Sequence, residues 1–131
     1  MASRMRSLWA ALCISAAATT VVHAQGLESL NETEAVGYCA TFYLAKMEHF
    51  AEDDAEGTIR AEADGFVAAA ASVAGKTTET MTDDLSQAAG MMRNFFRLAN
   101  LSDDAKTMVD QSEAFCRTLA PQYPQTIELF Q

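Results

Sequence analysis

The chain has 131 residues, with 9 basic and 18 acidic side chains and a net charge of −9. This length favours a single domain, and the acidic balance argues against binding to nucleic acid or to an anionic membrane surface. Half of the residues are hydrophobic, which is too many for a disordered chain.

The first 24 residues have the three-part pattern of a secretory signal peptide. Two arginines lie among the first six residues, an uncharged run follows over residues 8–22, and the small residue Ala24 closes the segment. The run is shorter than the roughly 20 residues that span a membrane. We therefore predict that residues 1–24 are cleaved and that residues 25–131 form a single exported helical domain with no transmembrane anchor. The periplasm of a Gram-negative bacterium is the favoured destination, and the extracellular space is the alternative.

The first two predicted helices follow this segment, and both show helical rather than strand-like periodicity. The first covers residues 32–52, with Asn31 as its N-cap and Glu34 completing a capping box. The second covers residues 55–74 and ends at Gly75. Apolar residues form one stripe on each helix: Val36, Cys39, Tyr43, Met47 and Phe50 on the first, and Ile59, Phe66, Ala70 and Val73 on the second.

The last two predicted helices cover residues 78–99 and a segment that begins after the N-cap Ser102. Asp103 and Asp104 occupy the first turn of the fourth helix, where the helix dipole favours negative charge, and Pro121 ends it. A short helical turn after Pro124 is expected to dock on the other helices through three side chains: Ile127, Leu129 and Phe130.

Short links join these helices, so they are expected to pack as antiparallel neighbours. The predicted fold is all-α, an up-down-up-down four-helix bundle. Signal cleavage leaves two cysteines, Cys39 near the start of the first helix and Cys116 near the end of the fourth. These two ends of the bundle coincide, and exported proteins oxidise their thiols, so we predict a Cys39–Cys116 disulfide that joins the first and fourth helices.

No catalytic motif is present, so we predict that the protein is not an enzyme and carries no cofactor or metal. Phosphate-binding loops, nucleophile elbows and zinc-protease motifs are absent. Cleavage leaves His49 as the one histidine, and its simplest role is that of a half-buried helix residue.

The acidic segment Glu52–Gly57 has carboxylates at positions one, three and five of a calcium loop and glycine at position six. Ala63 stands at position twelve, where a bidentate glutamate closes such sites. The alternatives are a weak calcium site and a solvated acidic turn in which Asp53 or Asp54 caps the second helix. Asn31 and Asn100 begin glycosylation sequons that matter only in a eukaryote.

These observations favour an exported binding, inhibitory or accessory protein that acts through an acidic helical surface on a protein partner with a basic surface. The acidic turn at residues 52–56 and the pair Asp103–Asp104 are the candidate contacts. Two alternatives remain: an acid-stress chaperone of the periplasm, whose apolar faces become exposed at low pH, and a bundle that carries a small ligand or a metal. The sequence leaves the oligomeric state open.

Overall fold

The computed structural model describes residues 26–130. The predicted signal peptide, residues 1–24, lies outside this range. The chain divides into two units, residues 1–30 and residues 31–131. In the first unit, the described part is the 3-10 helix η1 (Gly26–Ser29), which the Ser29 hydroxyl closes by donating a hydrogen bond to the Gly26 carbonyl.

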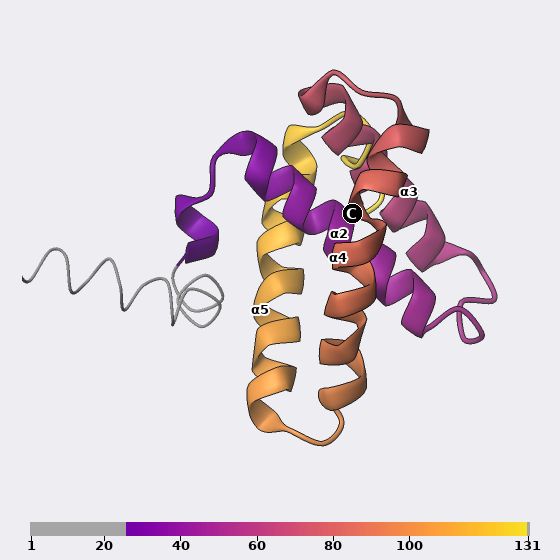
Figure 1. Cartoon of the computed structure of the whole chain (residues 1–131), viewed down its shortest axis with the longest axis vertical. Coiled ribbons are helices and arrows are strands. Elements are labelled where there is room, and N and C mark those ends of the chain that lie inside the picture. The colour runs from indigo at the N-terminus through magenta and orange to yellow at the C-terminus, as the bar shows by residue number, and fades with distance from the viewer. Residues whose placement is uncertain (1–25, 131) are drawn as a thin grey trace, which may run out of the picture. The chain divides into compact units, whose positions relative to one another are not determined.

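The second unit contains four α-helices and, over the residues that the structure describes, no strand. The helices are α2 (Glu32–His49), α3 (Thr58–Ala74), α4 (Thr78–Leu98) and α5 (Asp103–Leu119), followed by the 3-10 helix η2 (Ala120–Gln122). Successive helices alternate in direction (Figure 1). The all-α, up-down-up-down fold is therefore confirmed.

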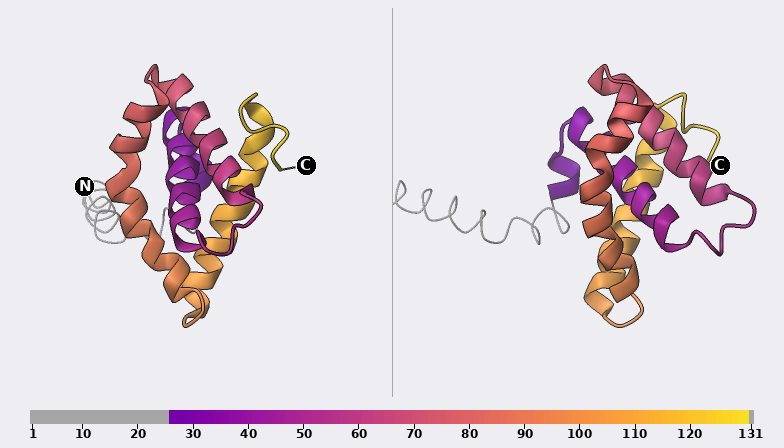
Figure 2. Two further views of the ribbon diagram at one scale, coloured as in Figure 1. Left: turned by 90° about the vertical axis from the view of Figure 1, so that its right-hand side faces the viewer. Right: turned by 45° about the vertical axis from the view of Figure 1, so that its right-hand side comes forward.

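Helix α2 packs against all three of the other α-helices. Figure 2 shows it flanked by α4 on one side and by α3 on the other. Its middle is consequently buried on every side, and not on one stripe as the sequence predicted: Ala40, Thr41, Leu44 and Ala45 are buried together with Cys39, Phe42 and Tyr43. A helix whose whole circumference is covered is expected to be apolar all round, and the polar side-chain groups in this stretch are the hydroxyls of Tyr43 and Thr41. The Thr41 hydroxyl donates a hydrogen bond to the Gly37 carbonyl at 2.8 Å.

The predicted helix starts are supported by side-chain caps. Asn31 accepts a hydrogen bond from the Glu34 backbone N–H at 2.8 Å, and the Glu34 carboxylate accepts one from the Asn31 N–H, which completes the predicted capping box. Ser102 caps α5 by accepting from the Ala105 N–H. These bonds satisfy donors that the first turn of a helix leaves without a partner.

The turn between α2 and α3 is longer than predicted and occupies residues 50–57. The Asp54 carboxylate accepts hydrogen bonds from the N–H groups of Ile59 and Arg60, at 3.1 and 3.0 Å. Gly57 has a φ of 71°, a left-handed conformation that favours glycine. Asp54 therefore caps α3 from within the turn. The helix begins at Thr58 and not at residue 55 as predicted.

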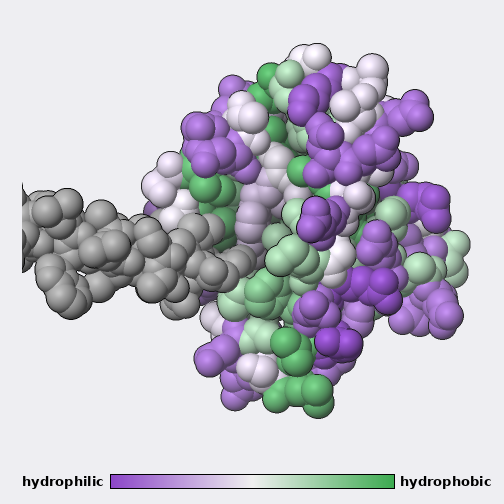
Figure 3. Space-filling model, viewed as in Figure 1, coloured by the Kyte–Doolittle hydropathy of each residue, from purple (hydrophilic) through white to green (hydrophobic). Residues whose placement is uncertain are grey.

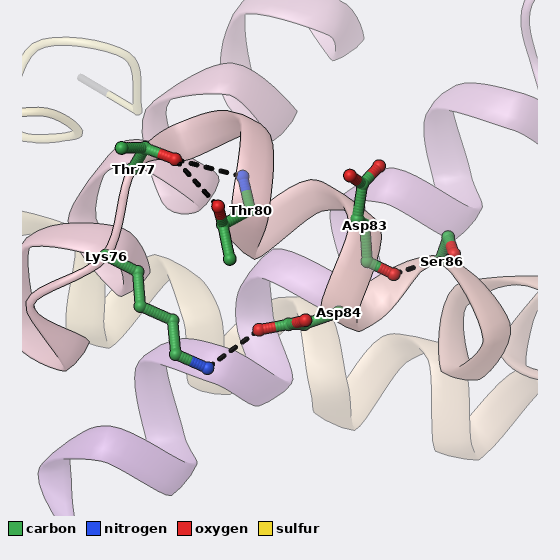
Figure 4. A network of polar contacts seen from close by, with 6 residues as sticks. All are labelled: Lys76, Thr77, Thr80, Asp83, Asp84 and Ser86. Atoms are coloured by element: carbon green, nitrogen blue, oxygen red, sulfur yellow. Dashed lines mark hydrogen bonds and ion pairs between the residues drawn. The ribbon is translucent and has the colours of Figure 1, made fainter.

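The turn between α3 and α4 is fixed by polar contacts around the first turns of α4 (Figure 4). Gly75 ends α3 with a φ of 68°, as predicted. The Thr77 hydroxyl caps α4 by accepting from the Thr80 N–H at 3.1 Å, and Lys76 pairs with Asp84 at 2.7 Å. Both members of that ion pair are about half exposed, so the cap contributes more to stability than the pair.

The segment after α5 returns across the bundle and packs on α3. Phe130 contacts the rings of Tyr43 and Phe66, at centroid distances of 5.4 and 5.6 Å, so the predicted docking of the C-terminal turn through this side chain is confirmed. Gly65 of α3 is buried beneath the segment. Ile127 was expected to dock as well but is 42% exposed.

Candidate protein-binding surface

The predicted disulfide joins Cys39 of α2 to Cys116 of α5, with the two Cα atoms 5.6 Å apart. Both cysteines are fully buried among the apolar residues of the core. Neither sulfur is a free thiol, so neither can act as a nucleophile or as a thiolate ligand. The pair is therefore part of the scaffold on which a functional surface is built.

A group of charged side chains, here called the α2–α5 ion cluster, consists of Lys46, Glu113 and Arg117. The Glu113 carboxylate lies 2.6 Å from Lys46 Nζ and 3.6 Å from an Arg117 guanidinium nitrogen. Lys46 also lies over the Tyr43 ring at 5.5 Å, and Arg117 over the Phe130 ring at 5.4 Å. Each of the three charged groups therefore has an oppositely charged or aromatic partner. Together these contacts link α2, α5 and the C-terminal segment.

Burial raises the pKa values of two side chains near this cluster. The pKa of the Glu62 carboxyl on α3 is raised mainly by burial, against the attraction of Lys46 and Arg117. The pKa of the Tyr43 hydroxyl is raised for the same primary reason, and the negative charge of Glu113 adds to it. Burial therefore shifts both groups toward their neutral forms, which is typical of a packed interior.

Replacing Glu62 by Gln is expected to raise the free energy of unfolding at neutral pH. A raised folded-state pKa means that the ionised carboxyl destabilises the folded chain above that pKa, and this penalty disappears as the pH falls through it. Urea unfolding at pH 7 and at about pH 4 should show the gain of Glu62→Gln at the higher pH only. The matched control is Glu56→Gln, which removes an exposed carboxylate. A loss of stability at pH 7 would show that Lys46 and Arg117 outweigh burial.

The acidic turn contains the helix-capping aspartate that one of the two alternatives predicted. Asp54 caps α3, while Glu52, Asp53 and Glu56 are exposed and Glu62 is buried within α3. Within the residues that the structure describes, no group of three or more His, Cys, Asp or Glu side chains could hold a metal ion. The turn therefore contributes negative charge to the surface.

Three large apolar side chains in the second half of α4 and in the turn that follows it are exposed. Leu101 is 82% exposed, Met91 is 67% exposed and Leu98 is 41% exposed. Met91 and Leu98 are seven residues apart and so share one face of α4, and Leu101 follows in the turn. This turn extends past the ends of α2 and α3 (Figure 1), and Figure 3 shows hydrophobic surface there with hydrophilic surface around it.

Carboxylates border these apolar side chains. Asp103 and Asp104, which were predicted as candidate contacts, are exposed in the first turn of α5, two and three residues after Leu101. We call residues 98–104 the hairpin tip. The exposure of Leu98 and Leu101 was not predicted from the sequence. The signal that could have found Leu101 is its position between Asn100 and Ser102, where a leucine has no helix face to join.

His49 lies at the end of α2, half-buried as expected, and its ring is held by two aromatic side chains. Its ring centroid is 4.6 Å from that of Phe50 and 6.0 Å from that of Phe96. Asn31 serves as the N-cap of α2, and Asn100 is exposed in the turn before α5. No helix over residues 26–130 is both long enough and apolar enough to cross a membrane.

Comparisons with known proteins assign no function to this surface. No protein-family profile matches the chain, and no curated protein or solved structure is significantly similar to it. The site is therefore interpreted from its own geometry.

Proposed function

We propose that this protein is an exported, non-enzymatic binding, inhibitory or accessory protein whose hairpin tip contacts a protein partner with a basic surface. The observation that supports this most is Leu101, an apolar side chain that is 82% exposed beside Asp103 and Asp104. Protein interfaces commonly have an apolar centre within a polar rim, and an exposed leucine among carboxylates has that arrangement.

Charge supports the same proposal. The whole chain has twice as many acidic as basic residues, so its field attracts a basic surface and raises the rate of encounter. The disulfide fits export to an oxidising compartment, because such bonds are rare in the cytosol. The disulfide and the helix caps support a rigid scaffold. A tip that projects from a rigid scaffold would present the same contact surface before and after binding.

Capture of the partner from the exported proteins of the source organism tests the proposal. Wild-type protein should retain a partner at low salt and lose most of it at about 0.5 M salt, where exposed charges are screened. Leu101→Ser should abolish capture, and the double variant Asp103→Asn with Asp104→Asn should weaken it. Ile127→Ser is the matched control, because Ile127 is also an exposed apolar residue but lies outside the hairpin tip.

The charge control is Glu79→Gln with Asp83→Asn, which removes two carboxylates from the other end of α4. Circular dichroism should show that all of these variants fold. Equal recovery of the same proteins by wild type and by both hairpin-tip variants would refute the proposal, as would the absence of any salt-sensitive partner.

A further inference from the structure

An open surface cavity of about 340 Å³ lies between the end of α2 and the second half of α4; its α4 residues are exposed to solvent and His49 is half-buried. Its lining residues are His49 from α2 and Gly90, Arg93, Asn94 and Arg97 from α4. The four α4 residues occupy positions i, i+3, i+4 and i+7, so they share one face of the helix. The lining contains two guanidinium groups, an imidazole and an amide, and no carboxylate.

The two arginines have no acidic partner. Within residues 26–130, the four ion pairs use Lys46, Lys76, Lys106 and Arg117. Arg93 and Arg97 take part in none of them, although acidic residues outnumber basic ones by two to one. Like charges at this spacing also repel each other and weaken a helix slightly. An arginine pair that is left uncompensated in so acidic a chain is available to bind an external anion.

His49 and Gly90, which also line the cavity, are compatible with a bound ligand. The ring of His49 packs against Phe50 and Phe96, and these contacts restrict its orientation. Gly90 lies inside α4, where glycine is less favourable than alanine by about 1 kcal/mol. A Cβ at Gly90 would have no atom within 4 Å, so helix packing does not require glycine here. Its missing side chain leaves that wall open.

We propose that this cavity binds an oxyanion of the phosphate class, either free or as the phosphate group of a small phosphoester. Guanidinium groups match phosphate oxygens through paired, charge-assisted hydrogen bonds, and Asn94 and His49 supply further polar groups. Another cavity, between α3 and α4, provides a contrast within the same chain. It is lined by Asp64 and Glu79 among other residues and by no cation, so an anion is expected to avoid it.

Nuclear magnetic resonance titration of the purified protein tests this inference, with the ring signals of His49 as the probe. Substitution His49→Gln assigns those signals. Inorganic phosphate and glycerol 3-phosphate at millimolar concentration should shift them in a saturable manner. Vesicles of phosphatidylcholine with and without phosphatidic acid provide the second arm. Saturation by the soluble phosphates identifies a free ligand, whereas a response to phosphatidic acid vesicles alone identifies a lipid headgroup.

Three substitutions locate the site. Arg93→Gln and Arg97→Gln should each weaken phosphate binding about tenfold or more, which corresponds to the loss of one strong charged contact. Gly90→Leu should abolish binding by filling the cavity without changing any charge. Arg60→Gln is the matched control, since Arg60 is an unpaired arginine on α3 that does not line the cavity.

Each result has a definite meaning for the inference. Loss of binding in the three cavity variants, with retention in Arg60→Gln, supports it. The inference is overturned if neither phosphate nor phosphatidic acid shifts the His49 signals, or if Arg60→Gln weakens binding as much as Arg93→Gln does. Because the hairpin tip is unchanged in these variants, partner capture should remain as in wild type, so the two proposals can fail separately.

Discussion

Replacing both Cys39 and Cys116 by Ala is expected to lower the free energy of unfolding by about 4.5 kcal/mol. The disulfide joins positions that are 77 residues apart, and the loop-entropy model assigns this value to a loop of that length because the unfolded chain regains the freedom that the cross-link removes. Domains of this size are typically stable by about 5–15 kcal/mol, so the loss is a large fraction of the total.

The disulfide is one of several specific side-chain links between α2 and α5. The others include the Tyr38–Ser112 hydrogen bond at 2.6 Å and the Lys46–Glu113 ion pair. The disulfide also contributes to the free energy of unfolding through packing, because both cysteines are fully buried in the core.

Urea unfolding monitored by circular dichroism measures the disulfide prediction. A reducing agent should destabilise wild type by a similar amount and leave the double variant unchanged, which separates loss of the cross-link from other effects of the reagent. If wild type and the double variant unfold at the same urea concentration, the cross-link makes no net contribution and the loop-entropy argument does not apply to this chain.

The features that could be predicted from the sequence are those set by neighbouring residues. Asn31 with Glu34, Gly75 and Ser102 mark helix ends through bonds or backbone conformations that span only a few positions. The disulfide could also be predicted, because helix lengths and short turns determine which helix ends coincide. These local signals were sufficient to obtain the fold class and the order of the helices.

The features that could not be predicted depend on which helices become neighbours. A stripe pattern on α2 gives no sign that α2 packs against all three of the other helices, so the burial of Ala40 and Leu44 was missed. The cavity requires His49 of α2 beside Arg93 and Arg97 of α4, positions that are far apart in the chain. The distance by which the α4–α5 turn extends past α2 and α3 is likewise not encoded by periodicity.

Two glycine-to-alanine substitutions are expected to change stability in opposite directions. Gly65→Ala should lower the free energy of unfolding by about 1–3 kcal/mol, the usual range for an overpacked core. Gly37→Ala should raise it by about 0.5–1 kcal/mol, because alanine is the better helix former. Both glycines lie inside helices, and neither has a positive φ. The gain in helix propensity is therefore common to both, and the difference isolates what the new methyl group meets.

At Gly65 the methyl group meets the C-terminal segment. Its carbon would lie 2.6 Å from Leu129 Cδ1 and 2.8 Å from the Gln125 carbonyl oxygen, whereas at Gly37 nothing lies within 4 Å. The Leu129 side chain can rotate away, but the carbonyl belongs to the backbone and can move only with the segment. That movement would disturb Thr126, whose buried hydroxyl donates to the Ala120 carbonyl at 2.7 Å.

Urea unfolding of both variants beside wild type measures the two changes, and hydrogen exchange locates them. In Gly65→Ala the backbone amides of Ile127 and Leu129 should exchange faster, because their bonds to Tyr123 and Thr126 belong to the displaced segment. In Gly37→Ala these amides should exchange as in wild type. If Gly65→Ala stabilises the protein as Gly37→Ala is expected to, the C-terminal segment does not pack on α3 in solution. The contacts of Phe130 with Tyr43 and Phe66 would then contribute little to the core.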